Sequence, residues 1–513
     1  MQGRYRCQRH CSHSPACGNI QSRSGYCDST ECEKTNLQKE NIFGMKQLSG
    51  LDAAFYHQDS KRTPMHVTAV LVYGPSAQSA PLDASTLQGL FEHAVAPFAF
   101  IDHKLVDHTM GMEEPYWVYD KSFSVNDHVH TQKLPAPGDW QQLKAIISSI
   151  HSCRLPMGKP LWNATLVEGV NELENCPRGS VALVLRVHHA VADGMSIARL
   201  LAWMHEDHDA APATSAALRK KQPVKPDFFK LWQQSSVKSW SRPIQLVKTL
   251  SNLLPRLGGV SEGSKVPGHT TEIANTKTRF NVEVEANRVF GAVQLPINEI
   301  KGIKRDVRRV TVNDIALCVV AGGLRSYLKH HGELPATSVV SGVPVNLRAR
   351  GDVESGNNIS MMQVGLATDI SDPIQRLRAI HEYALIGKAK TKALGKESLK
   401  QVSDSLSPVI LAEGIKLISF ATMATDLPVP FHVLVSNVPG SVKPLALQGH
   451  PVHALFGLGP LRDSMGLFHI VSNTDKRYAI SFTSCESMMP DADFYEACLH
   501  DSYASLLAAC KNL

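Results

Sequence analysis

Two hydrophobic periods alternate along most of the chain, and together they predict a mixed α/β protein. Residues 66–73 (HVTAVLVY) and 181–187 (VALVLRV) are short apolar runs rich in β-branched residues, a pattern typical of buried strands. Residues 84–95 and 196–205 instead repeat apolar positions with the spacing of a helix. Ser49 has the side chain of a helix N-cap, so a further helix is expected to begin there.

The last third of the chain predicts a second region of strands and helices. A helix is expected to begin at Asp372-Pro373, because proline fits the first helical turn. The other elements that the pattern predicts are strands at 288–295, 338–345, 431–438 and 478–484 and a helix at 312–329. Each region is therefore expected to form a sheet flanked by helices.

Composition divides the chain into four parts. Residues 1–44 hold five of the eleven cysteines but no CxxC pair, so a disordered or non-native extension is expected rather than a metal knuckle. Residues 207–287 combine prolines, basic residues and large apolar residues without a regular period. We therefore expect an N-terminal domain at 45–206 and a C-terminal domain at 288–513, joined by a basic amphipathic connection.

Composition and charge also exclude several classes of protein. The 513 residues are 43% hydrophobic and 19% charged, a globular composition at a length that suggests two domains. A net charge of +6 is too small to indicate nucleic-acid binding. The longest apolar run, residues 315–324, is about half of what spans a bilayer. The polar start lacks the apolar segment of a secretory signal, so a cytoplasmic protein is expected.

The densest cluster of reactive side chains is HHAVADG at residues 188–194, at the end of a predicted strand. Adjacent strand residues point to opposite faces, so only one imidazole can face a given cavity. A neutral imidazole is suited to take a proton from a hydroxyl group near pH 7. Asp193 is expected to fix the loop by an ion pair or to orient a histidine, and Gly194 to permit a backbone conformation that alanine would resist. The alternative is a pair of histidines buried in the core.

Two other kinds of chemistry find little support. The chain has no GxSxG nucleophile elbow, which favours direct attack by a bound alcohol over a covalent acyl-enzyme. His205 and His208 lie three residues apart, but HExxH and a carboxylate at ligand spacing are absent from the sequence. No metal site is therefore expected.

The HHxxxDG pattern resembles the signature of the coenzyme-A-dependent acyltransferase superfamily. Flanking motifs make the chain similar to one branch of it, the bacterial wax ester synthase/diacylglycerol acyltransferase family, from residue 45 to about residue 510. The small departures, Gly50 and Asn346, do not touch the proposed chemistry. The motifs that carry the resemblance are LSGLDAAF (48–55), TPMHV (63–67), PLW (160–162), VNDI (312–315), GGLRSYL (322–328), VPVNLR (343–348), GN (356–357) and SNVPG (436–440).

This resemblance implies two α/β domains like those of chloramphenicol acetyltransferase, each with a mixed sheet, and an active-site tunnel at their interface. It implies transfer of a fatty acyl group from acyl-CoA, as co-substrate, to a fatty alcohol or to diacylglycerol, without a cofactor. His189 would be the general base, His188 a support on the opposite face, and Asp193 a structural residue.

The other motifs carry further expectations. Asn313 is expected to contribute to the oxyanion region and Asp314 to anchor the N-terminus of its helix, although both residue types are also plain helix caps. Ser436 and Asn437 are expected near the active centre, where an architectural role is the alternative. The triplet Pro160, Leu161 and Trp162 could line an acyl channel or lie in the core.

Both substrates partition into lipid, so peripheral association with the inner face of the cell membrane or with lipid inclusions is expected. Residues 225–257 combine aromatic and basic side chains, the composition of an interfacial segment, although a tether packed on its own domains is the alternative. Two other functions stay open. One is an HHxxxDG acyltransferase with a carrier-protein or non-lipid acceptor, and the other is a non-catalytic acyl-CoA-binding protein of lipid droplets.

Overall fold

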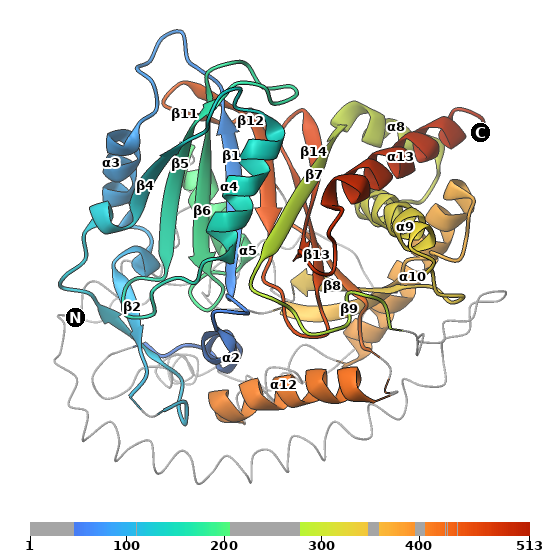
Figure 1. Ribbon diagram of the computed structural model, residues 1–513, viewed down its shortest axis with the longest axis horizontal. Helices are drawn as coiled ribbons and strands as arrows, with labels where there is room; N and C mark the ends of the chain where they lie inside the picture. Colours follow the sequence, from blue (N-terminus) through green and yellow to red (C-terminus); the bar gives the residue numbers. More distant parts are fainter. Residues whose placement is uncertain are drawn as a thin grey trace, which may run out of the picture.

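The computed structural model describes residues 46–205, 277–346, 359–394 and 406–513, apart from residues 109, 426, 428 and 439. Two six-stranded mixed sheets lie side by side in it, each flanked by helices (Figure 1). The predicted N-terminal extension and most of the predicted connection, including residues 225–257, lie outside the described residues. No helix within the described ranges is long and apolar enough to cross a membrane.

The first sheet has the strand order β11-β12-β1-β6-β5-β4, and only the β4–β5 pair is parallel. Helices α3 and α5 pack on one face of this sheet, and α4 covers the other face. The strands are β1 (His66–Tyr73), β4 (Val129–Lys133), β5 (Trp162–Val170), β6 (Ser180–His188), β11 (Ala446–Leu447) and β12 (His450–Leu458). The helices of this half are α2 (Gly50–Gln58), α3 (Ala84–Ala94), α4 (Trp140–Ser152) and α5 (Gly194–Met204), with a small hairpin of β2 (His103–Val106) and β3 (Tyr116–Tyr119).

The second sheet has the order β7-β14-β13-β10-β8-β9, with β10 parallel to both of its neighbours. Its strands are β7 (Arg288–Pro296), β8 (Val340–Asn346), β9 (Ile359–Gly365), β10 (Val433–Asn437), β13 (Leu467–Asn473) and β14 (Arg477–Cys485). Its helices are α8 (Ile297–Asp306), α9 (Val312–His330), α10 (Pro373–Leu394) and α13 (Ala492–Cys510), while α12 (Pro408–Ala424) lies beside α2 of the other half (Figure 1). The strands and helices that the sequence predicts are confirmed to within about two residues.

The two halves share a core. The predicted domain boundary at residue 288 therefore does not separate two independent cores. Strand β12 belongs to the second half by sequence but pairs with β1 in the first sheet. Phe456 of β12 lies in one apolar cluster with Val70 of β1 and with Phe290 and Ala479 of the second sheet. Burial of these apolar side chains favours the pairing of β12 with the first sheet, because buried apolar area stabilises by roughly 25 cal/mol per Å².

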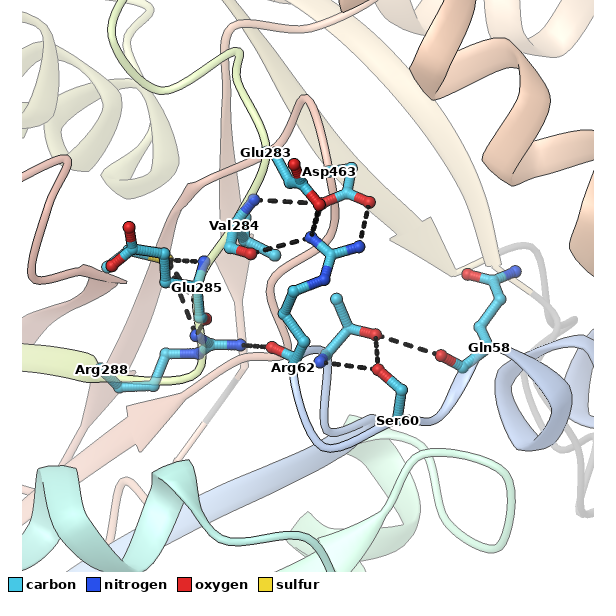
Figure 2. A network of polar contacts seen from close by, with 10 residues as sticks. Gln58, Ser60, Arg62, Glu283, Val284, Glu285, Arg288 and Asp463 are labelled. Carbon is cyan, nitrogen blue, oxygen red and sulfur yellow. Dashed lines mark hydrogen bonds and ion pairs between the residues drawn. The ribbon is translucent and has the colours of Figure 1, made fainter.

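A half-buried ion pair also joins the halves. Arg62, in the loop before β1, donates from both terminal nitrogens to the carboxylate of Asp463, at 2.6 and 2.8 Å. The same guanidinium donates to the carbonyl oxygen of Val284, and Arg288 donates to the carbonyl oxygen of Arg62 (Figure 2). This bidentate contact fixes the loop that leads into β1 against the second half of the chain.

Candidate active site

His189 follows directly after the last residue of β6, at the point where the strand leaves the sheet. Its backbone N–H donates to the carbonyl oxygen of Met65, at 2.8 Å. Its imidazole stacks on the ring of Phe55 from α2, with ring centroids 4.2 Å apart and planes inclined by 18°. The half-buried imidazole is thus oriented by a strand end on one side and by a helix on the other.

Burial sets the protonation state of this imidazole. Loss of solvent lowers the pKa of His189 to about 4, and the nearby Asp193 carboxylate opposes part of this shift. The ordinary pKa of a histidine is about 6.5. His189 is therefore neutral at pH 7, which is the form that accepts a proton.

His188 is the last residue of β6, and its contacts differ from those of His189. It is fully buried, its Nδ1 accepts a hydrogen bond from Ala190 N at 3.1 Å, and its Nε2 lies 3.6 Å from Asp59 Oδ1. Asp59 also accepts a hydrogen bond from Met65 N and pairs with Arg154. Burial alone would raise the pKa of Asp59, but the nearby imidazole of His188 and the hydrogen bond from Arg154 hold it below its ordinary value.

Asp193 and Gly194 begin helix α5. Asp193 is its N-cap, and one carboxylate oxygen accepts hydrogen bonds from the backbone N–H and the hydroxyl of Ser196, at 2.8 and 2.7 Å. The expectation that Gly194 needs an unusual backbone conformation is wrong, because its φ does not lie in the left-handed region. A Cβ on Gly194 would lie 3.5 Å from Val438 Cγ2, an ordinary contact. The glycine thus marks a place where the two halves of the chain approach closely.

A cavity of about 750 Å³ opens at this approach. It lies between β1, α5 and residues 438 and 440–445, which follow β10. Gly194 and Val438 both line it, whereas His189, five residues before Gly194, lies outside the lining. Most of the other lining side chains are apolar, among them Val67, Ile197, Leu455 and Ile470. The space is suited to a hydrocarbon chain.

The predicted residues of helix α9 lie apart from this cavity. Asp314 is buried at the third helical position, forms a capping box with Thr311, and pairs with His381 Nδ1 at 2.8 Å. These contacts agree with the predicted helix anchor. Asn313 is half-buried beside it, and no residue of α9 is among the described residues that line the cavity. Its part in the oxyanion region stays a prediction.

The remaining predicted residues lie either in the core or at the end of β10, next to the cavity. Pro160, Leu161 and Trp162 are buried, and the Trp162 ring donates from Nε1 to the carbonyl oxygen of Ile101. This triplet is outside the cavity lining, which favours the core over the acyl channel. Ser436 and Asn437 end β10 and pair with β13, and the cavity lining begins only at the residue that follows them.

Sequence reasoning missed three residues around the histidines. Phe55 lies inside the LSGLDAAF motif, so its neighbourhood was recognised but not its contact with His189. Asp59 and Arg154 lie 95 positions apart and carry no local signal that would pair them. Only the fold brings them together beneath His188.

Comparison with known proteins agrees with this arrangement. Residues 48–316 match the family described as the wax ester synthase/diacylglycerol acyltransferase catalytic domain, and residues 355–507 match the corresponding C-terminal domain. A Mycobacterium tuberculosis protein provisionally named diacylglycerol O-acyltransferase is 28% identical over 455 residues, which is 87% of each chain. A Mycobacterium bovis protein of the same name is 28% identical, covering 87% of this chain and 95% of its own.

Two solved structures show the same fold. One is the wax ester synthase/diacylglycerol acyltransferase of Marinobacter aquaeolei, which matches with a TM-score of 0.64 and 19% identity, over 91% of this chain and 99% of that one. The other is the first condensation domain of the CDA synthetase, with a TM-score of 0.53 and 14% identity over 91% and 97%.

Proposed function

Because the chain belongs to the wax ester synthase/diacylglycerol acyltransferase family, we propose that it transfers a fatty acyl group from acyl-CoA to a lipid hydroxyl, with His189 as general base. The acceptor is a long-chain alcohol or diacylglycerol. The observation that carries this proposal is the neutral imidazole of His189, held between Met65 and Phe55 at the end of β6.

The reaction proceeds by direct attack. His189 takes the proton of the acceptor hydroxyl as its oxygen forms a bond to the thioester carbonyl carbon, and the carbonyl electron pair moves onto oxygen. When that pair returns, the carbon–sulfur bond breaks and the imidazolium gives its proton to the coenzyme A thiolate. His188 supports the site through Asp59, and Asn313 contributes to the oxyanion region.

The cavity beside Gly194 takes one hydrocarbon chain of the substrates. Its apolar lining from both halves of the molecule supports this assignment. Basic side chains, Arg199 and Lys443, also line it and suit the acidic part of acyl-CoA.

The protein works at a lipid surface, and none of the helices in the described ranges could span the membrane. Helix α12 supports this part of the proposal, since four of its apolar side chains are each more than half exposed. A solvated apolar face of this kind is typical of an interfacial helix. The side chains are Ile410, Leu417, Ile418 and Phe420. Residues 225–257, with their aromatic and basic side chains, provide a second contact.

Two alternatives are weaker. An acceptor on a carrier protein would follow the likeness to condensation domains, but that likeness, at 14% identity, concerns the fold alone. A non-catalytic acyl-CoA-binding protein would not need a neutral, oriented His189.

A thiol-release assay on the purified protein tests the function. Palmitoyl-CoA is offered with hexadecanol, with dipalmitoylglycerol or with buffer, and acceptor-dependent release of coenzyme A is expected. Mass spectrometry of the intact protein after incubation with acyl-CoA alone should find no acylated serine or cysteine. Stoichiometric acylation would contradict direct attack.

A further inference from the structure

The loop between β12 and β13 carries a guanidinium whose adjacent carboxylate is engaged elsewhere. Arg462 stands next to Asp463, but both oxygens of Asp463 accept hydrogen bonds from Arg62, and one also accepts from Val284 N (Figure 2). The contacts of Arg462 are with neutral atoms. Its Nη1 donates to Gln58 Oε1 at 3.3 Å, and its Nη2 lies 4.0 Å from Met465 Sδ. Within the described parts of the chain, no carboxylate pairs with it.

Arg462 nevertheless keeps its charge. Burial lowers the pKa of its guanidinium to about 10, so the group is still protonated at pH 7. Its side chain is half-buried, so protein surrounds it while some of its surface stays accessible. Removing a cation from water without a paired anion is costly. A ligand that brings a negative charge to Arg462 would offset part of that cost.

The guanidinium lies close to His189. Gln58, which accepts its hydrogen bond, stands three residues after Phe55 in helix α2, and side chains at this spacing are neighbours on one helix face, about 5–6 Å apart. Phe55 stacks on the imidazole of His189. Burial is the main cause of the lowered pKa of His189, and the positive charge of Arg462 lowers it further.

We infer that Arg462 is an anion-binding group of the active site. It binds a negatively charged oxygen on the acyl carbon of the substrate, beside His189. This inference rests on the proposed acyl transfer. The anion has two sources. One is the oxyanion that forms when the hydroxyl oxygen bonds to the thioester carbon and that disappears when the carbon–sulfur bond breaks. The other is the carboxylate of a bound fatty acid.

The test uses neutral replacements of Arg462. Arg462→Met keeps much of the length without the charge, and Arg462→Gln keeps a polar group that can reach Gln58. Arg462→Lys keeps the charge. Arg376→Met is the control, because Arg376 is a buried arginine that donates to backbone carbonyl oxygens in the second half of the chain. We would measure kcat and KM by thiol release, palmitate affinity by displacement of a fluorescent fatty acid, and the melting temperature.

We expect Arg462→Met and Arg462→Gln to lower kcat by roughly 10²–10³-fold, as for loss of one oxyanion donor. Their melting temperatures should not fall, because an unpaired, half-buried charge is removed, and Arg462→Lys should recover part of kcat. The control should lower the melting temperature without this loss of kcat. A fall in kcat with unchanged palmitate affinity would show that Arg462 binds the transient oxyanion. Weaker palmitate binding would show that it binds the carboxylate of a fatty acid.

The inference is overturned if the neutral variants keep both kcat and palmitate affinity within about twofold of the parent. It is also overturned if their loss of activity matches a loss of folded protein. If Arg462→Met does not fold, Arg462→Gln tests the inference by the same measurements. Absence of thiol release in the parent would refute the proposed function instead, while palmitate binding still tests Arg462.

Discussion

The ring of Phe55 lies nearly parallel to the imidazole of His189, with the two centroids 4.2 Å apart. Phe55 comes from α2, the first described helix, whereas His189 directly follows β6, a central strand of the first sheet. The contact leaves the imidazole few orientations. It therefore connects the most N-terminal family motif with the histidine that we propose as the base.

Replacing Phe55 tests this contact. Phe55→Ala should lower kcat by roughly 10–100-fold, because a reacting group that is displaced by about 1 Å loses activity on this scale. Phe55→Leu should lose less, since it keeps apolar bulk against the ring. Thiol release gives kcat, and circular dichroism melting shows whether the fold survives. Equal kcat in Phe55→Ala and the parent would mean that the stack does not orient the base.

The pKa of His189 predicts the pH dependence of activity. A base must be unprotonated, and burial lowers the pKa of His189 to about 4, so activity should be lost only as the pH falls through that region. The profile of kcat/KM, which reports the free enzyme, should be flat from about pH 6 to pH 8. An acid limb centred at or above about pH 6.5 would indicate an ordinary, solvated histidine instead.

Asp59 should matter for both stability and positioning. Asp59→Asn removes the buried charge that pairs with Arg154 and lies 3.6 Å from His188. The carboxylate is buried but Arg154 is exposed to solvent, so loss of the pair should cost about 1–2 kcal/mol of unfolding free energy, and kcat should fall with little change in KM. Asp127→Asn is the matched control, because the Asp127–Lys159 pair is exposed and its loss should leave melting temperature and kcat unchanged. A variant of Asp59 with the parent's melting temperature and kcat would contradict this role.

Vesicle flotation can show whether helix α12 and residues 225–257 bind lipid. The triple variant Leu417→Ser, Ile418→Ser, Phe420→Ser removes exposed apolar area from α12, and binding to anionic vesicles should weaken by at least tenfold. Phe228→Ser, Phe229→Ser, Trp232→Ser and Lys230→Glu combined test the second segment in the same way. If both variants, folded by circular dichroism, float as well as the parent at the same salt, the proposed lipid contacts are wrong.

The sequence predicts most of the local structure because caps and periods are local signals. Ser49 is the N-cap of α2, as predicted, and accepts a hydrogen bond from Asp52 N; the helix predicted at 312–329 is α9. The strand exchange of β12 was not predictable, because periodicity identifies a strand but not its partner. The surroundings of His189 were missed for a related reason. His66 pairs with His188 across β1 and β6, and this register brings Met65 to His189. The sequence gives the residue types but not this register.

The central claim is that His189 removes the proton from the acceptor hydroxyl. The most direct test is the rate of thiol release from palmitoyl-CoA by His189→Ala, beside the parent and His188→Ala. General-base catalysis predicts that His189→Ala lowers turnover by roughly 10²–10⁴-fold with an unchanged circular dichroism spectrum. His188→Ala should lose less activity relative to its loss of stability. Turnover by His189→Ala equal to that of the parent would contradict the mechanism.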